Sequence, residues 1–202
     1  MAEAREHTVV DPAAMRALAH PIRWSLIEAL GVEGTATATR CAEILGESQA
    51  TCSFHLRQLA RYGFVQEAPS DSKRERPWRL TQLEQSWSAA DAEDELTGRA
   101  SRALTAAFVE RETGRLQNWV QNTHRAPKKW QHAWGLNGSL TWLTADELDA
   151  LSQTLTDALE VHRERLTDPA TRPAGSLPVR MFSVVYPLTE YPPAEGDHVS
   201  TA

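Results

Sequence analysis

The chain has 202 residues, of which 41% are hydrophobic and 24% charged, a composition typical of a globular protein and not of a disordered one. No apolar run approaches the roughly 18 residues that a membrane span needs, and the N-terminus lacks a signal peptide's apolar core, so we expect a cytosolic protein with no membrane partner. The net charge of −6, taken alone, argues against a nucleic-acid partner.

The residues up to Gly31 predict two helices. Asp11 can cap the first helix, with Pro12 at its first position. His20 must then leave the helical region because it precedes a proline. Pro21 can start the second helix, and Gly31 is expected to end it. The sequence therefore predicts two consecutive helices, with the helical conformation interrupted at His20.

A third and a fourth helix are predicted next, with a sharp turn between them. The third lies within residues 35–48 and turns at Gly46, and Ser48 is a good N-cap for the fourth, at 49–62. Gly63 is expected to stop the fourth helix. Its buried face is given by apolar residues at i, i+4 and i+7. These residues are Cys52, Leu56 and Leu59.

Two short strands, at 64–68 and 76–81, are expected to form a hairpin around a polar loop. The region from Ser53 to Leu80 holds six basic residues and three acidic ones, whereas much of the acidity lies elsewhere, as in the run 91–95. The location of charge matters more than its sum for binding a polyanion. The sequence therefore predicts one basic end and one acidic end.

The second half of the chain begins with a long predicted helix at 98–125, followed by a loop-rich stretch. An amphipathic helix is predicted at 143–166, where Thr144 and Glu147 fit a capping box. Residues 179–188 have the strongest strand pattern in the chain. The fold class is therefore mainly α with a small β-wing, extended by a helical region and a C-terminal strand.

The outer side of the helix at 49–62 carries short polar groups where a plain packing helix would favour Glu and Lys. Because its apolar face packs inward, the N-terminal half must face a partner that pairs with such groups. The edges of bases in a DNA major groove are such a partner. The third and fourth helices are thus a helix-turn-helix, and the hairpin is its wing.

Residues 14–81 resemble the DNA-binding domain of the ArsR-type winged-helix regulators. The segment "ALAHPIRWSLIEAL" resembles the family's opening helices, "SQATCSFHLRQLARYGFV" its recognition helix, and "RERPWRL" the second strand of its wing. The resemblance covers about a third of the chain. It implies a transcriptional regulator that binds double-stranded DNA, more often as a repressor than as an activator.

Carried over residue by residue, the resemblance implies contacts to base edges from Gln49, Ala50, Ser53, Phe54 and Arg57. Phe54 departs from the polar residue often found at its position. It would either touch a thymine methyl group or pack on the wing.

Other contacts implied by the resemblance go to the DNA backbone. Ser48 and Thr51 would reach phosphates through their hydroxyl groups, and Arg23 would clamp a phosphate. His55 matches the family's histidine and either belongs to this interface or bonds a neighbouring helix end. The wing would contact the backbone or the minor groove through its basic residues, which are Lys73, Arg74, Arg76 and Arg79.

The family includes metal sensors, but the sequence predicts no metal site, no cofactor and no catalytic site. Its thiolate sensors carry a Cys-x-Cys pair on the third helix, whereas Cys41 stands alone here. Cys41 and Cys52 both fall on apolar faces, where a free cysteine behaves as a small hydrophobe. Thiol sensing through these two residues stays an alternative. We find no phosphate-binding loop and no nucleophile with a base, and therefore expect no enzyme.

The division into domains follows from the change of pattern after the hairpin. Residues 1–90 are the predicted DNA-binding domain, and residues 91–202 are a helical region for forming a homodimer. A two-fold dimer sets two recognition helices about 34 Å apart, one turn of the duplex, and so requires a near-palindromic operator.

Four tryptophans, in the stretch from Trp119 to Trp142, offer an alternative role for the second half. Aromatic walls beside glycine-containing loops suit an apolar small-molecule effector, although the simpler interpretation is that these residues are core. A winged helix that grips a protein instead of DNA is a further alternative, supported by the acidic net charge. The four tryptophans are Trp119, Trp130, Trp134 and Trp142.

Overall fold

The computed structural model describes residues 9, 11–70, 76–82, 87 and 94–188. The chain divides into two compact units, one made of residues 1–137 and 162–178 and the other of residues 138–161 and 179–202. The first unit holds a winged helix-turn-helix fold with additional helices, and its elements are mainly α with a small antiparallel sheet, as predicted.

The first two helices begin where the sequence predicts. Helix α1, Pro12–Leu18, is capped by Asp11, whose side chain accepts a hydrogen bond from Ala13 N at 2.9 Å. The break at His20 precedes α2, Pro21–Glu33. The predicted end of this helix at Gly31 is wrong, because α2 continues for one more turn to the next glycine. Gly34 ends it with a φ of 76°, a conformation that favours glycine.

The helix-turn-helix follows directly. Strand β1, Thr35–Ala36, precedes α3, Ala38–Leu45, whose N-cap is Thr37, so the predicted third helix starts three residues later than its predicted range. Gly46 makes the turn in the left-handed region, at φ 69°. Helix α4, Gln49–Arg61, starts after Ser48 and ends before Tyr62.

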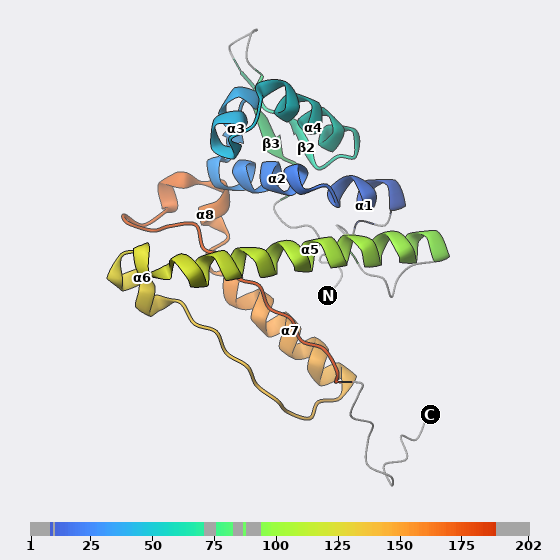
Figure 1. Cartoon of the computed structure of the whole chain (residues 1–202), viewed down its shortest axis with the longest axis vertical. Helices are drawn as coiled ribbons and strands as arrows, with labels where there is room; N and C mark the ends of the chain where they lie inside the picture. The colour runs from blue at the N-terminus through green and yellow to red at the C-terminus, as the bar shows by residue number, and fades with distance from the viewer. Residues whose placement is uncertain (1–8, 10, 71–75, 83–86, 88–93, 189–202) are drawn as a thin grey trace. The chain divides into compact units, whose positions relative to one another are not determined.

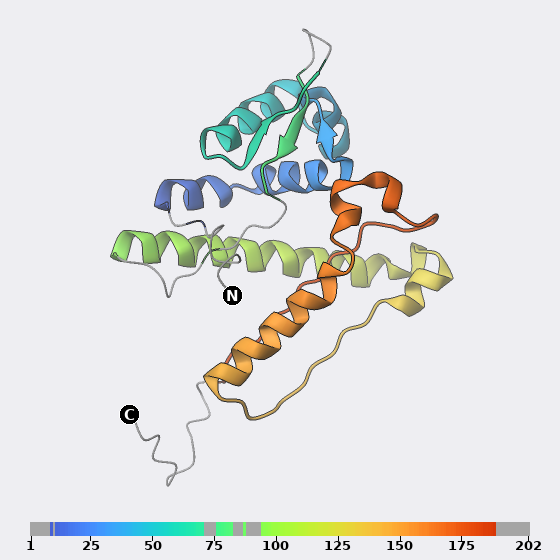
Figure 2. The same cartoon turned by 180° about the vertical axis from the view of Figure 1, so that it is seen from behind.

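The wing is a three-stranded antiparallel sheet in the order β1-β3-β2, seen from behind in Figure 2. The predicted hairpin is confirmed as β2, Val65–Glu67, and β3, Trp78–Leu80, with Glu67 opposite Trp78. The third strand, β1, was not predicted, and Ala36 of β1 also lies opposite Trp78.

One core joins these elements. Figure 1 shows α3, α4 and the sheet on one side of α2, and α5, Glu95–Asn122, running along the other side of α1 and α2. Helix α5 confirms the predicted long helix, starting slightly earlier. It packs along α1, and its Leu104 is fully buried. Fully buried residues from α1, α2 and α4 include Leu18, Leu26, Leu30 and Leu56.

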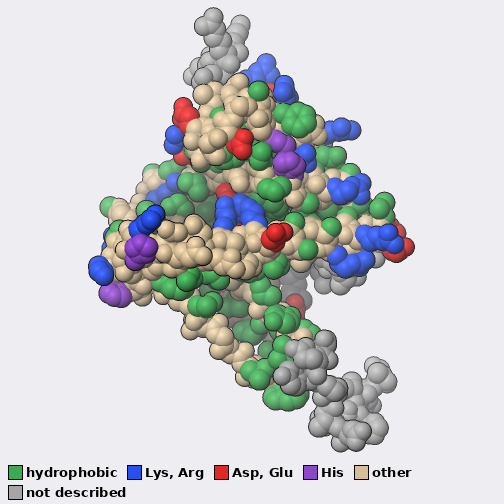
Figure 3. All heavy atoms as spheres, in the orientation of Figure 1, with side chains coloured by type: hydrophobic (Ala, Val, Ile, Leu, Met, Phe, Trp, Pro, Cys, Tyr) green, Lys and Arg blue, Asp and Glu red, His purple; other side chains and the backbone are tan. Residues whose placement is uncertain are grey.

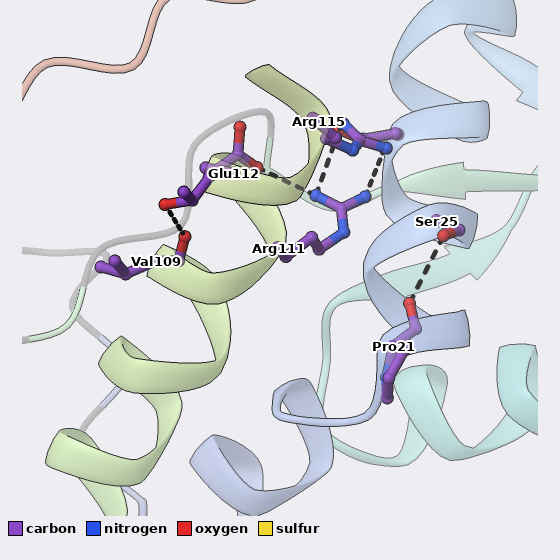
Figure 4. Close-up of polar contacts among 8 residues, drawn as sticks. Pro21, Ser25, Val109, Arg111, Glu112 and Arg115 are labelled. Carbon is purple, nitrogen blue, oxygen red and sulfur yellow. Dashed lines mark hydrogen bonds and ion pairs between the residues drawn. The ribbon is translucent and has the colours of Figure 1, made fainter. Parts of the chain in front are cut away.

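An ion cluster ties α5 to α2. Both oxygens of Glu28, on α2, accept hydrogen bonds from Arg115, and Arg111 donates to the same carboxylate at 2.5 and 3.3 Å. Arg111 also bonds Glu112 at 3.0 Å. Figure 4 shows Arg111 and Arg115 pointing from α5 toward α2. Burial alone would raise the pKa of Glu28, but the bonds from Arg115 and Arg111 outweigh it and lower that pKa.

The rest of the first unit is made of short elements. After α5 come the 3-10 turn η2, Thr123–Arg125, and helix α6, Lys128–Ala133. Helix α8, Glu164–Thr167, packs with the 3-10 turn η3, Pro169–Thr171. Arg172 then donates to the carbonyl of Val32, at the end of α2, at 3.1 Å.

The second unit contains one helix among its described residues, α7, Ala145–Glu160. Its capping box is confirmed: Glu147 N donates to the Thr144 hydroxyl, and Thr144 N donates to the Glu147 carboxylate at 2.8 Å. The predicted strand at 179–188 is wrong. These residues form no described strand, since an alternating pattern makes a strand only where a neighbouring strand pairs with it, and all three described strands belong to the first unit.

No helix in the described part of the chain is long and apolar enough to cross a membrane.

Candidate nucleic-acid interface

The N-terminus of α4 is fixed by a side-chain cap. Ser48 Oγ accepts a hydrogen bond from Thr51 N at 3.0 Å, and the Ser48 and Thr51 hydroxyls bond each other at 2.8 Å. The remaining amide groups of the first turn point out of the helix, where the helix dipole favours an anion. The two hydroxyl groups predicted to reach phosphates therefore lie together at the start of α4.

The inner face of α4 determines which side chains face outward. Cys52, Leu56 and Leu59 are fully buried, as predicted from their spacing. They hold α4 against α2, α3 and β2. Because side chains three and four positions apart share a helix face, the opposite face is available to a partner.

That opposite face presents one continuous stripe. Ala50, Phe54 and Arg57 follow each other at i, i+4 and i+7, and all three are exposed. Gln49 is also exposed and Ser53 is half-buried. The structure therefore brings together all five residues predicted to contact base edges.

Phe54 and Arg57 are the two largest side chains of this stripe. Phe54 is 52% exposed, which is high for an aromatic ring, and its edge contacts the ring of His55 at 5.1 Å between centroids. The Arg57 side chain makes no hydrogen bond or ion pair with any described residue. Its guanidinium can donate two parallel hydrogen bonds, which suits the edge of a guanine.

Each of the two described arginines of the wing, Arg76 and Arg79, lies beside a polar side chain of the neighbouring strand. Arg76 bonds Glu67 at 2.9 Å, and both side chains are exposed. Gln66 lies opposite Arg79 in the sheet, and turning its amide group places the oxygen where it accepts from Arg79 Nη2 and Nε at 2.9 and 3.0 Å. Lys73 and Arg74 lie outside the described residues. Figure 3, which has the orientation of Figure 1, shows Lys and Arg side chains projecting at several points over the helix-turn-helix and along α5.

Arg23, on α2, and His55, on α4, lie away from the exposed stripe, where α4 packs against the other helices. His55 is only 8% exposed, and its Nδ1 accepts a long hydrogen bond of 3.4 Å from Arg23 Nε. Arg23 Nη1 donates to the carbonyl of Ala17 at 2.7 Å, and the His20 ring lies 4.5 Å from that of His55. Burial above all, and then the nearby His20 and Arg23, lower the pKa of His55.

The two cysteines are buried within the helix-turn-helix. Burial raises the pKa of Cys41 to about 11, and it also raises the pKa of Cys52. Both thiols are fully inaccessible and protonated at neutral pH, which makes them unreactive. Among the described residues, no group of three or more His, Cys, Asp or Glu side chains is arranged to hold a metal ion.

The predicted tryptophan pocket divides between the two units. Trp119 and Trp134 meet edge to face, with 6.3 Å between ring centroids, and Trp130 is half-buried beside Lys129. Trp142 belongs to the second unit and is 85% exposed. The structure therefore brings two of the four tryptophans into contact.

Sequence reasoning missed the aromatic and cation–π contacts that Trp24 makes with Trp87 and with α5. Trp24 of α2 contacts Trp87 and Phe108, at centroid distances of 5.7 and 5.2 Å, and the Arg111 guanidinium lies over the Trp24 ring. These residues are more than 60 positions apart in the sequence, so no local pattern relates them.

A comparison with protein-family models matches residues 18–67 to a family described as "Helix-turn-helix domain". The match spans α2, β1, α3, α4 and β2, and so includes the turn and the exposed stripe described above. No curated protein sequence is significantly similar to the chain.

Among solved structures, a mutant of MarR from E. coli is 16% identical, with a TM-score of 0.32 over 69% of this chain and 76% of that one. A mutant of ZitR from Lactococcus lactis in its apo form is 17% identical, with a TM-score of 0.30 over 70% of this chain and 80% of that one. At this level of similarity, neither protein indicates what this chain binds.

Proposed function

We propose that the chain is a sequence-specific transcriptional regulator of the ArsR-like type, which binds a near-palindromic operator as a homodimer and acts as a repressor. Residues 1–90 serve as its DNA-binding domain, and residues 91–202 serve dimerisation. The observation that carries the proposal is the exposed stripe of α4, where Arg57 has no partner in the described part of the chain. A helix-turn-helix domain of this kind places that face of its second helix in the major groove.

The proposed contacts to the DNA backbone follow from placing α4 in the major groove. With α4 in the groove, its capped N-terminus directs free amide groups and the hydroxyls of Ser48 and Thr51 toward a phosphate. The wing then lies over the adjacent DNA backbone with Arg76 and Arg79 at its surface. Lys73 and Arg74, which lie outside the described residues, are proposed to contact the same backbone. The acidic net charge does not prevent this, because binding depends on the charge near the contact.

Arg57→Ala tests the reading of bases by α4. If Arg57 bonds a guanine, the variant loses about 1–3 kcal/mol of binding free energy on the preferred site, and its preference at that base pair relaxes. Arg102→Ala is the matched control, because it removes one exposed arginine from α5. Titrations by fluorescence anisotropy on the preferred site and on single-base variants measure both effects. Equal weakening on every sequence would contradict base reading by Arg57.

A small-molecule effector is the second candidate function, and the contact between Trp119 and Trp134 favours it. An aromatic ligand at this pair would quench tryptophan fluorescence and change the DNA affinity of the full chain. Titration of a metabolite panel into the wild type and a Trp134→Phe variant tests this. Quenching that is identical in both proteins would exclude a site at the Trp119–Trp134 pair.

A further inference from the structure

A single guanidinium joins three helices at the base of the recognition helix. Arg23 is in the first turn of α2. Its Nη1 donates to the carbonyl of Ala17, in the last turn of α1, and its Nε donates to Nδ1 of His55, in the middle of α4. Because His55 is buried and Arg23 is half-buried, these bonds form away from the exposed stripe of α4.

The bond to His55 requires a neutral imidazole. Arg23 always donates, so Nδ1 of His55 must hold a lone pair, and the ring proton must be on Nε2. Protonation of Nδ1 removes the acceptor and places a positive charge against the Arg23 guanidinium. The neutral ring also contacts Phe54, the exposed aromatic side chain next to it on α4.

The groups around His55 offer little compensation for a positive charge. His20, which precedes α2, and Arg23, on α2, both oppose protonation. Glu47, in the turn between α3 and α4, favours it. No other described ionisable group on α1, α3 or β2 perturbs His55. Burial adds to the opposition, so the pKa of His55 is below its usual value of 6.5.

We propose that Arg23 and His55 are positioning residues that fix α4 against α1 and α2, and that protonation of His55 releases α4 and weakens DNA binding under acidic conditions. This proposal rests on the proposed function only for its effect on DNA, because the release of α4 occurs in the free protein as well. It assigns Arg23 and His55 a role different from the direct DNA contacts that the sequence resemblance implies.

The sign of the pH dependence separates these two roles. The folded protein holds His55 neutral more firmly than the unfolded chain does, so the packing of α4 is fully stable above about pH 6.5 and weakens as the pH falls below that value. DNA affinity then falls on acidification. A histidine that contacts a phosphate directly would bind more tightly on acidification, because the phosphate favours the imidazolium.

The test uses the full chain and its preferred duplex at constant ionic strength, between pH 8 and pH 5.5. Losing one hydrogen bond of ordinary strength corresponds to roughly a threefold to tenfold loss of affinity for the protonated form, so the affinity of the wild type should fall progressively toward the acidic end. His55→Gln keeps a side-chain acceptor that does not titrate in this range, so its affinity should stay constant. His20→Gln should keep the fall, because His55 can still be protonated in it. A wild type that binds equally or more tightly at pH 5.5 would overturn the proposal.

Hydrogen exchange of the wild type without DNA provides a measurement independent of DNA and of any variant. After correction for intrinsic rates, the amides of α4 should lose protection between pH 7.5 and pH 5.5, and those of α7 should not. Loss of protection in a protein that binds no DNA at any pH would refute the proposed function and support the release of α4. Unchanged protection of α4 would refute the release itself.

Discussion

Replacing Glu28 with glutamine tests the ion cluster between α2 and α5. The Glu28 side chain is 23% exposed and accepts hydrogen bonds from both Arg111, which is 13% exposed, and Arg115. Glutamine has nearly the same shape but no charge. Glu28→Gln therefore removes the anion and leaves two arginines facing each other at the helix interface.

The size of the expected loss in stability depends on which interactions each arginine keeps in the variant. Removing one member of a buried pair costs about 3–5 kcal/mol. Arg111 still has Glu112 at 3.0 Å, and Arg115 is 42% exposed and can turn to water. We therefore expect Glu28→Gln to lower the free energy of unfolding by about 2–3 kcal/mol at pH 7. Glu95→Gln is the matched control, since the pair of Glu95 with Arg99 is 76% and 69% exposed and should contribute about 0–0.5 kcal/mol.

Urea denaturation of the wild type and both variants measures these differences. The pKa of Glu28 lies below its usual value of 4.5 because the arginines stabilise the carboxylate, so its contribution is complete above about pH 4.5. It decreases as the pH falls through the lowered pKa. The gap between the wild type and Glu28→Gln should therefore narrow at acidic pH. A Glu28→Gln variant as stable as Glu95→Gln at pH 7 would refute the reasoning.

Three further predictions concern the helix-turn-helix and the wing. Ser48→Ala removes the cap of α4 and should cost about 1 kcal/mol in urea denaturation, and a loss below 0.3 kcal/mol would argue against the cap. Cys41 and Cys52 should react with a thiol reagent at pH 7.5 only after unfolding, because both are buried with raised pKa values; rapid labelling of the native protein would contradict this. Glu67→Gln should tighten DNA binding about threefold at low salt, because it frees Arg76; weaker binding would indicate that their ion pair maintains the shape of the wing.

The elements that the sequence predicted well are those encoded by local chemistry. Asp11 and Ser48 cap their helices because each can bond an amide two or three residues ahead. The capping box at Thr144 follows the same rule. The buried face of α4 followed from its apolar spacing.

The elements that the sequence predicted poorly depend on distant partners. Strand β1 has only two residues, too few for a pattern, and it exists because β3 pairs with it. Residues 179–188 show the opposite case, a strong pattern without a described strand beside it. Local rules also gave no reason to prefer Gly34 over Gly31 as the end of α2.

The residues of the candidate site also differ in how far they could be predicted from the sequence. The five residues of α4 expected at base edges came from the family resemblance, and the structure leaves four of them exposed and Ser53 half-buried. The placement of His55 was left open between DNA and a neighbouring helix, and only the structure shows its bond to Arg23, 32 residues away. The pairing of Arg76 with Glu67 likewise depends on how the two strands of the wing align.

The most direct test of the proposed function is the selection of bound genomic fragments by the purified full chain, followed by titration of the best site at two salt concentrations. The proposal predicts one inverted-repeat motif whose half-sites lie about one helical turn, or 34 Å, apart, with binding that weakens steeply as salt increases. Weak binding without sequence preference, at either salt concentration, would contradict a dimeric regulator that reads its operator through α4.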